Sequence, residues 1–118
     1  MTRLLNSFKF AFRGFWVAVK EQSNLRIHLV VSLFVVLVAY LLRVQTIEWL
    51  ILLICIALVI SLELVNSAIE GLVDLVSAER LPLAGKIKDM AAAAVLVAAV
   101  IASLVGVVIF GSYLLSYV

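Results

Sequence analysis

The sequence predicts an all-α integral membrane protein with an N-terminal amphipathic surface helix and three transmembrane helices, in a single domain of residues 1–118. Of the 118 residues, 67% are hydrophobic and 14% are charged. A soluble domain is nearer to about half apolar and about a quarter charged. The apolar residues form three long runs with short polar segments between them, and a stretch of mixed aromatic and basic residues precedes the first run.

Residues 1–25 are expected to form a helix that lies on the membrane surface. With the helical period, apolar side chains at positions 4, 8, 12, 15 and 19 share one face, which positions 5 and 16 widen to about 120°. Arg3, Arg13 and Lys20 lie on the other side, which suits an interfacial helix on anionic lipid. Phe10 breaks the pattern and points with the polar side. Because no compact apolar core is present here, we expect no cleaved signal peptide.

The first span is expected at residues 27–43. Its 16 uncharged residues, numbers 27–42, reach about 24 Å as a helix. The arginines at the two ends, Arg26 and Arg43, can extend the span by snorkelling to the membrane surface. His28 stands just inside the start of this span. We interpret it mainly as an interfacial histidine, with a role in a functional site as the alternative.

The second span is expected at residues 47–76, after a short polar turn. Thr46 is the candidate N-cap of this helix, and Glu48 places a favourable negative charge in its first turn. Residues 49–62 are uncharged, and carboxylates begin at position 63. The acidic residues therefore lie toward the far membrane surface.

The third span is expected at residues 86–117, after a loop at residues 77–85. The loop holds Pro82 and Gly85, and both residue types disfavour a continuous helix through it. Residues 90–118 contain no charge over 29 positions, so this helix is long enough to cross the bilayer with some tilt.

Basic residues are distributed unevenly around the spans, and this asymmetry predicts the orientation. Eight of the nine either precede the first span or lie between the second and third spans, and Arg43 alone lies on the opposite side. The positive-inside rule places the N-terminus and the loop at residues 77–89 in the cytoplasm, and the C-terminus outside. We therefore expect a multi-pass protein of the plasma membrane.

The end of the second span carries a polar face, which we call the acidic stripe: Glu63, Asn66, Glu70 and Asp74. These side chains fall within about 80° of one another around a helix. Carboxylates are expensive in hydrocarbon, so this stripe needs a cation, a proton or water. We expect the end of this stripe to meet the lysines that follow the loop, and the polar end of residues 1–25, at the depth of the cytoplasmic membrane surface.

The residue types of the acidic stripe suit phosphoryl transfer. Carboxylate and amide oxygens suit Mg²⁺, lysines suit phosphate, and a carboxylate can act as a base. The sequence has no Walker A motif, no cluster of histidines and cysteines and no glycine-rich phosphate loop, which excludes a soluble type of nucleotide-binding fold. On these residues alone, an enzyme, an ion or proton pathway and a structural seam between protomers remain open.

Two motifs carry a resemblance to a known family. The first is Glu63-x-x-Asn66-Ser67-Ala68-Ile69-Glu70-x-x-Val73-Asp74, and the second, eleven residues later, is Lys86-Ile87-Lys88-Asp89-Met90-Ala91-Ala92-Ala93-Ala94-Val95. Together they resemble the small bacterial membrane lipid kinases, which include prokaryotic diacylglycerol kinase and undecaprenol kinase. The resemblance implies a homotrimer in the bacterial inner membrane, with active sites shared between protomers at the cytoplasmic surface. It also implies a membrane lipid as acceptor and Mg²⁺-ATP as phosphoryl donor, and no nucleic-acid partner is expected.

The resemblance implies roles for individual residues. Glu63 resembles the catalytic base and Glu70 resembles a Mg²⁺ ligand, with Asn66 and Asp74 in the same polar cluster. The side chains expected near the nucleotide are Arg3, Phe10, Glu79, Arg80, Leu81, Lys88 and Asp89.

One position departs from the family pattern. The family commonly has a metal-binding glutamate four residues before Arg26, where this chain has Gln22, preceded by Glu21. Either Gln22 acts as a metal ligand through its carbonyl oxygen, or Glu21 reaches the metal from a shifted helix, or water fills the place.

The segments Arg26-Ile27-His28-Leu29 and Ser7-Phe8-Lys9-Phe10-Ala11 resemble the undecaprenol kinase branch, whereas the diacylglycerol branch tends to carry an acidic residue at position 28. The expected function is therefore ATP-dependent phosphorylation of undecaprenol. The alternative is a diacylglycerol kinase that makes phosphatidic acid for phospholipid biosynthesis. A small oligomeric channel or transporter is the rival from another class, and an inactive homologue that serves as a membrane partner is a third reading.

Overall fold

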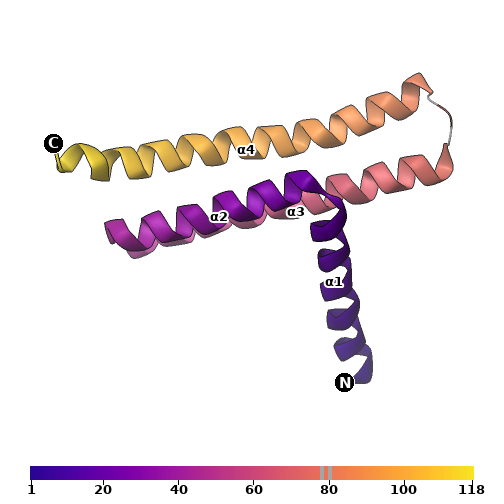
Figure 1. The fold of residues 1–118 in the computed structure, drawn as a ribbon, viewed down its shortest axis with the longest axis horizontal. Coiled ribbons are helices and arrows are strands. Elements are labelled where there is room, and N and C mark those ends of the chain that lie inside the picture. Colours follow the sequence, from indigo (N-terminus) through magenta and orange to yellow (C-terminus); the bar gives the residue numbers. More distant parts are fainter. Residues whose placement is uncertain (78, 80) are drawn as a thin grey trace.

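A computed structural model of the chain describes residues 1–77, 79 and 81–118, and all regular secondary structure in them is helical. The helices are α1 (Thr2–Glu21), α2 (Ser23–Leu42), α3 (Thr46–Val76) and α4 (Pro82–Ser116). Figure 1 shows α2, α3 and α4 running alongside one another, while α1 leaves the side of this bundle and ends at the N-terminus. Helix α4 packs mainly against α3 and much less against α2.

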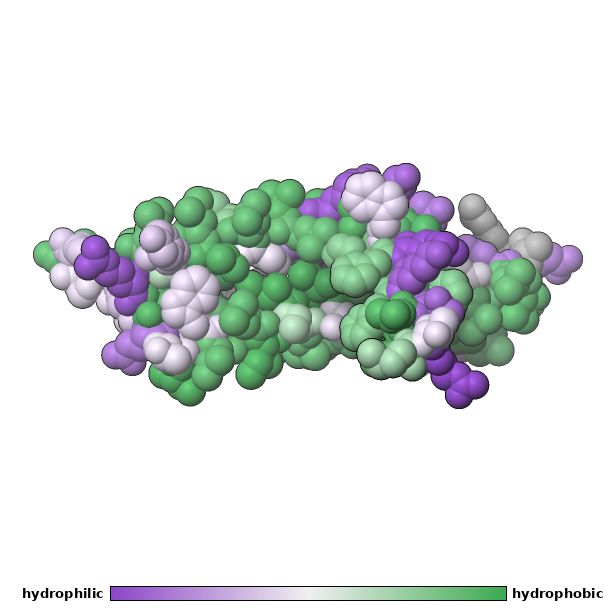
Figure 2. Space-filling view, turned by 90° about the horizontal axis from the view of Figure 1, so that it is seen from below, coloured by the Kyte–Doolittle hydropathy of each residue, from purple (hydrophilic) through white to green (hydrophobic). Residues whose placement is uncertain are grey.

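Three of these helices are long and apolar enough to cross a membrane, namely α2, α3 and α4. Helices α3 and α4 have 31 and 35 residues, or about 46 and 52 Å of length, against roughly 30 Å for the hydrocarbon core. Their ends therefore extend beyond the hydrocarbon. Figure 2 shows apolar side chains along the length of the bundle and hydrophilic ones toward its ends and around α1. The predicted all-α, multi-pass membrane architecture is confirmed.

The corner between α1 and α2 comes earlier in the chain than expected, because the helix predicted through residue 25 ends at Glu21. Gln22 has extended backbone angles, φ −109° and ψ 108°, and separates the two helices. The guanidinium of Arg26 donates hydrogen bonds from Nη1 to the carbonyl oxygens of Val19 and Lys20, each at 2.8 Å. These carbonyls belong to the last turn of α1 and have no partner within that helix. Arg26 on α2 therefore caps α1 and fixes the corner.

The turn between α2 and α3 is closed by polar contacts. Arg43 adopts the left-handed conformation, with φ 55°, and Gln45 precedes α3 with extended angles. The backbone N–H of Gln45 donates a hydrogen bond to Oε1 of Glu48 at 3.0 Å, and the hydroxyl of Tyr113 on α4 donates to the same oxygen. The expected N-cap, Thr46, is wrong: it is the first helical residue, because Glu48 stands three positions after Gln45 and satisfies the backbone there.

A buried apolar cluster lies beside this turn. Ala39, Val44, Leu52 and Ile109 come from α2, the turn, α3 and α4, and they are buried together. Buried apolar side chains are closely packed, so removal of even one methylene group from them lowers the stability of the protein. The three long helices therefore share a buried apolar cluster beside this turn.

At the opposite end of the bundle, α4 begins at Pro82, four residues before the expected start of the third span at residue 86. Proline suits the first helical position, because its fixed φ matches the helix and its missing N–H is not needed there. Leu81 has the extended conformation that a residue before proline prefers, with ψ 143°. The N–H of Gly85 already donates to the carbonyl of Leu81, so the glycine lies inside the first turn.

Candidate functional site

The acidic stripe on α3 runs from the interior of the bundle to its surface. Glu63 and Asn66 are 3% and 7% exposed, Glu70 is half-buried and Asp74 is exposed. Glu63 and Asp74 are eleven positions apart, which is about 16 Å along the helix. The stripe therefore follows the helix axis and passes from buried to exposed surroundings.

Glu63, at the buried end of the stripe, faces α2. Its Oε2 lies 3.7 Å from Nε2 of His28. The backbone carbonyl of Glu63 accepts a hydrogen bond from Oγ of Ser67 at 3.0 Å. The imidazole thus stands beside the buried carboxylate, and both interpretations of His28, as an interfacial residue and as part of a functional site, stay predictions.

One turn further along α3, Asn66 and Glu70 form a second pair. The side-chain amide of Asn66 donates from Nδ2 to Oε1 of Glu70 at 3.3 Å. The carbonyl oxygen Oδ1 of Asn66 is buried and accepts no hydrogen bond within the part of the chain that the structure describes. A buried acceptor without a partner is costly, so this oxygen is available to a ligand that supplies a cation or a donor.

These oxygens fit a magnesium ion in their chemistry, because Mg²⁺ prefers carboxylate and carbonyl oxygens together with water and phosphate. In residues 1–77, 79 and 81–118, no three His, Cys, Asp or Glu side chains converge as a metal site. A cation near Glu70 therefore needs the amide oxygen of Asn66 and further oxygens from water, phosphate or a neighbouring chain.

The exposed end of the stripe contacts α4. Nζ of Lys88 lies 2.6 Å from Oδ1 of Asp74, which joins α3 and α4 next to the loop. A hollow of about 370 Å³ lies beside this pair. It is lined by Val73, Asp74, Ser77, Glu79, Leu81, Ala84, Gly85 and Lys88. The structure thus brings three of the predicted nucleotide contacts together, namely Glu79, Leu81 and Lys88. Asp89, the residue after Lys88 on α4, is exposed. Arg80 lies outside the described residues.

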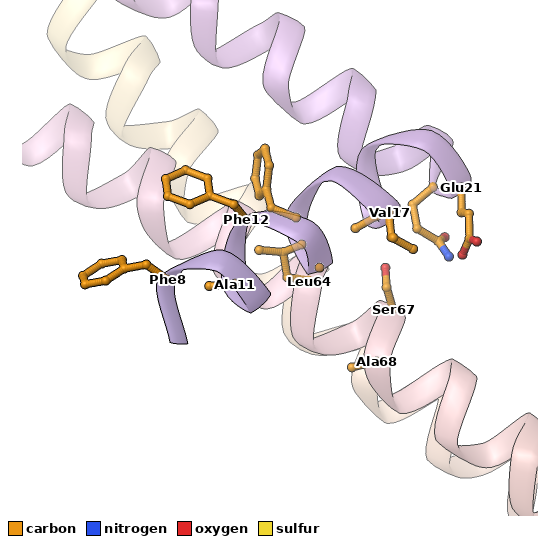
Figure 3. Close-up of a pocket in the computed structure, with 12 residues that line it drawn as sticks. Phe8, Ala11, Phe12, Val17, Glu21, Leu64, Ser67 and Ala68 are labelled. Atoms are coloured by element: carbon orange, nitrogen blue, oxygen red, sulfur yellow. The ribbon is translucent and has the colours of Figure 1, made fainter. Parts of the chain in front are cut away.

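A groove of about 780 Å³ separates α1 from α3. Figure 3 shows Phe8, Phe12 and Val17 of α1 along this groove, with Leu64, Ser67 and Ala68 of α3 facing them. Glu21 and Gln22 line it at the corner between α1 and α2. The sequence pattern assigned these aromatic side chains to lipid and gave no sign that α3 would face them, because that contact depends on the direction in which α1 leaves the bundle.

Arg3 and Phe10 are not brought to the acidic stripe. The guanidinium of Arg13 lies over the ring of Phe10, 5.7 Å from its centre. Among the described residues, no hydrogen bond or ion pair joins the side chain of Arg3 or Phe10 to α3 or α4. Both residues are exposed on the part of α1 that projects from the bundle in Figure 1.

The arrangement of buried carboxylate, unpaired amide oxygen and lysine follows the two motifs noted in the sequence, and comparison with known proteins decides the family. The family model described as "Prokaryotic diacylglycerol kinase" matches residues 9–110. The chain belongs to this family. The resemblance read from the sequence is thereby confirmed.

Several curated members of the family are similar to this chain over most of its length. "Undecaprenol kinase" of Bacillus subtilis (strain 168) is 39% identical over 110 residues, which cover 93% of this chain and 89% of that protein. "Diacylglycerol kinase" of Escherichia coli (strain K12) is 32% identical over 112 residues, or 95% of this chain and 92% of that protein. "Diacylglycerol kinase" of Synechocystis sp. is 41% identical over 104 residues, or 87% of this chain and 59% of that protein.

Membership in this kinase family assigns a chemical class to the site. Kinases of this family take the phosphoryl group from ATP and transfer it to a lipid. The three apolar helices agree with a lipid acceptor, because they make this chain a multi-pass membrane protein.

Proposed function

We propose that this chain is an ATP-dependent lipid kinase that phosphorylates undecaprenol, with diacylglycerol as the alternative acceptor. The observation that carries the proposal is the buried Glu63 at the head of a stripe that ends in the Asp74–Lys88 pair. A lipid hydroxyl can reach the buried end from the bilayer, and a nucleotide can reach the exposed end from water. The similarity to the Bacillus subtilis undecaprenol kinase favours the polyprenol.

Glu63 is the proposed general base. In the reaction, the lipid oxygen forms a bond to the γ-phosphorus of ATP, and the bond between that phosphorus and the β,γ-bridging oxygen breaks to release ADP. The hydroxyl proton passes to the carboxylate of Glu63. Burial at 3% exposure keeps bulk water from this carboxylate, and positioning supplies most of the catalysis in such transfers.

The residues proposed to hold Mg²⁺ are Glu70 of α3 and Gln22 at the corner between α1 and α2, with Glu21 as the alternative to Gln22. The unpaired Oδ1 of Asn66 supports this assignment, because it adds a neutral oxygen next to the Glu70 carboxylate. When bound, Mg²⁺ would neutralise phosphate charge. Asn66 also orients Glu70 through its amide hydrogen bond.

The nucleotide is proposed to lie in the hollow beside Asp74 and Lys88, with Glu79, Arg80 and Leu81 over the adenosine and Asp89 at its edge. Lys88 would leave Asp74 to contact phosphate. Arg3 and Phe10 are proposed nucleotide contacts as well, although α1 carries them away from the Lys88 of their own chain. A homotrimer with shared sites accounts for this separation, because α1 of one protomer can then meet α4 of another.

The proposed orientation places α1 on the cytoplasmic surface of the bacterial inner membrane, with its aromatic face toward lipid. Eight of the nine basic residues lie in or near α1, or between the end of α3 and the second turn of α4, and this bias favours a cytoplasmic location for that end. The nucleotide hollow would then face the cytoplasm, where ATP is available, and the C-terminus would lie outside.

The deciding experiment is a lipid-phosphorylation assay with γ-labelled ATP and Mg²⁺. The purified full chain in mixed micelles receives undecaprenol or diacylglycerol in parallel, and the lipid products are separated by thin-layer chromatography. We expect labelled undecaprenyl phosphate with the higher kcat/KM. Label only in phosphatidic acid would establish the alternative acceptor, and no labelled lipid from either acceptor would reject the kinase in favour of a channel, transporter or inactive homologue.

A further inference from the structure

A buried carboxylate requires compensation from its surroundings, and the chain provides little of it around Glu63. The amide of Asn66 bonds to Glu70, and the hydroxyl of Ser67 bonds to the backbone of Glu63. Within the described residues, His28 is the one basic side chain within 4 Å of the Glu63 carboxylate, and no hydrogen bond reaches that carboxylate. An uncompensated buried carboxylate is strongly destabilising, so the position of His28 has consequences for Glu63.

The backbone that carries His28 is held firmly. Leu25 is fully buried and Arg26 is fixed by its two hydrogen bonds to the last turn of α1. The carbonyl of His28 accepts a hydrogen bond from Oγ of Ser32 at 2.7 Å. Because these contacts fix the start of α2, the imidazole approaches Glu63 from a defined direction and is itself about a quarter exposed.

The separation of 3.7 Å between Nε2 and Oε2 is longer than a hydrogen bond. Catalytic contacts are often long before substrate binds and shorten in the complex. A nucleophile, a base and a third group that orients the base form a recurring arrangement in enzymes, and the acceptor hydroxyl, Glu63 and His28 match it in kind.

We propose that His28 is a positioning residue for Glu63. Its Nε2–H holds Oε2 of the carboxylate, so that Oε1 remains free to accept the proton of the lipid hydroxyl. The inference rests on the proposed function, because it gives Glu63 an orienting partner for that reaction. It adds a contribution from α2 to a site otherwise built from the α3 stripe and its neighbours.

Three variants of one position test the inference. His28→Gln places an amide N–H at about the reach of Nε2, whereas His28→Asn places its amide nearer to the backbone, about where Nδ1 lies, and cannot reach Glu63. The two variants are both neutral and polar, so they form a matched pair. His28→Leu preserves much of the volume and removes every donor.

The measurement is steady-state phosphorylation of undecaprenol, with kcat and the KM for ATP determined separately, together with Tm and the size-exclusion profile. We expect His28→Asn and His28→Leu to lower kcat about 10-fold or more, with the KM for ATP within about twofold of wild type. His28→Gln is expected to retain most of the wild-type kcat. A purely structural role would instead lower Tm and reduce kcat in His28→Gln and His28→Asn alike.

Equal kcat in wild type and His28→Leu would overturn the inference, and so would a His28→Gln variant as slow as His28→Asn. Should His28→Leu fail to fold, the comparison of Gln with Asn still decides. A wild-type protein that labels neither lipid would overturn the proposed function and this inference with it, whereas an active wild type with an unaffected His28→Leu variant overturns the inference alone.

Discussion

The two ends of the helical bundle are built differently. At the turn between α2 and α3, apolar side chains from three helices are buried together, and the polar groups of Gln45, Glu48 and Tyr113 satisfy one another. Where α1 leaves the side of the bundle, Glu63 is buried beside a single imidazole and the Oδ1 of Asn66 has no partner in the described residues.

If the proposed function is right, the residues that stabilise the bundle and the residues that carry the chemistry lie in different places along the helix axis. Buried polar groups without a hydrogen-bond partner lower stability. Proteins retain them mainly at functional sites, where a ligand can supply the missing partner. The closely packed turn end holds α2, α3 and α4 in register, and this register in turn places His28 opposite Glu63. Substitutions at the two ends should therefore have different signatures, with activity lost at one end and stability lost at the other.

The largest effect is expected for Glu63→Gln. Removal of the proposed base should lower kcat for lipid phosphorylation by about 10³-fold, within the range of general base catalysis. The Tm should stay equal or rise, because a neutral amide is easier to bury than a carboxylate. The labelled-ATP assay and thermal unfolding in the same detergent measure both. Near-normal turnover would remove Glu63 as the base.

The next largest effect is expected for Leu52→Ala at the other end. Leu52 is 3% exposed in the apolar cluster, and truncation of such a side chain costs about 2–5 kcal/mol. We expect a clear drop in Tm and a kcat close to wild type at a temperature where the variant is folded. Leu50→Ala, at a position 52% exposed, is the matched control with a smaller effect. A selective loss of kcat would contradict the separation of the two ends.

An intermediate effect is expected for Arg26→Leu. This change keeps an apolar stem but removes both hydrogen bonds to the last turn of α1. The corner should loosen, which displaces Gln22 and the groove, and we expect kcat/KM for the lipid to fall about 10-fold because small displacements around a catalytic site are costly. Lys9→Leu, which removes a charge on α1 away from this corner, is the control. Equal activity in both variants would show that the corner does not position the site.

The smallest effect is expected for Tyr113→Phe. The change removes the hydroxyl that donates to Glu48 and leaves the ring in place. We expect Tm to fall by a few °C, because one hydrogen bond contributes modestly, and kcat to stay unchanged. Tyr117→Phe, at an exposed position near the C-terminus, should change neither. A loss of activity in Tyr113→Phe would mean that the turn end communicates with the site.

The sequence predicted the membrane class, the number of long helices and the motifs of the family, because composition and helical period act locally. It missed the exact helix ends at Gln22, Gln45 and Pro82, where a single side chain or a proline decides between neighbouring positions. The start of α4 was predictable from the preference of proline for the first helical position. Trimer formation, orientation and the roles of the site residues stay predictions.

The site itself was predictable on one helix and not between helices. Spacing alone placed Glu63, Asn66, Glu70 and Asp74 on one face of α3. The approach of His28 to Glu63 depends on which faces α2 and α3 turn toward each other, and the spacing within either helix does not determine that. The hydrogen bonds from Arg26 to the last turn of α1 and the absence of a partner for Oδ1 of Asn66 among the described residues depend on how the helices pack. The pattern of residues along one helix does not predict them.

The passage of the acidic stripe from a buried to an exposed position over about 16 Å has a kinetic consequence for the proposed reaction. The two substrates arrive from different phases, one dissolved in the bilayer and one in water, and neither crosses the boundary. The rate should then follow the mole fraction of acceptor in the membrane and not its concentration in the whole sample. Dilution with inert lipid or detergent would slow turnover at constant total acceptor, while dilution with buffer would act through ATP alone.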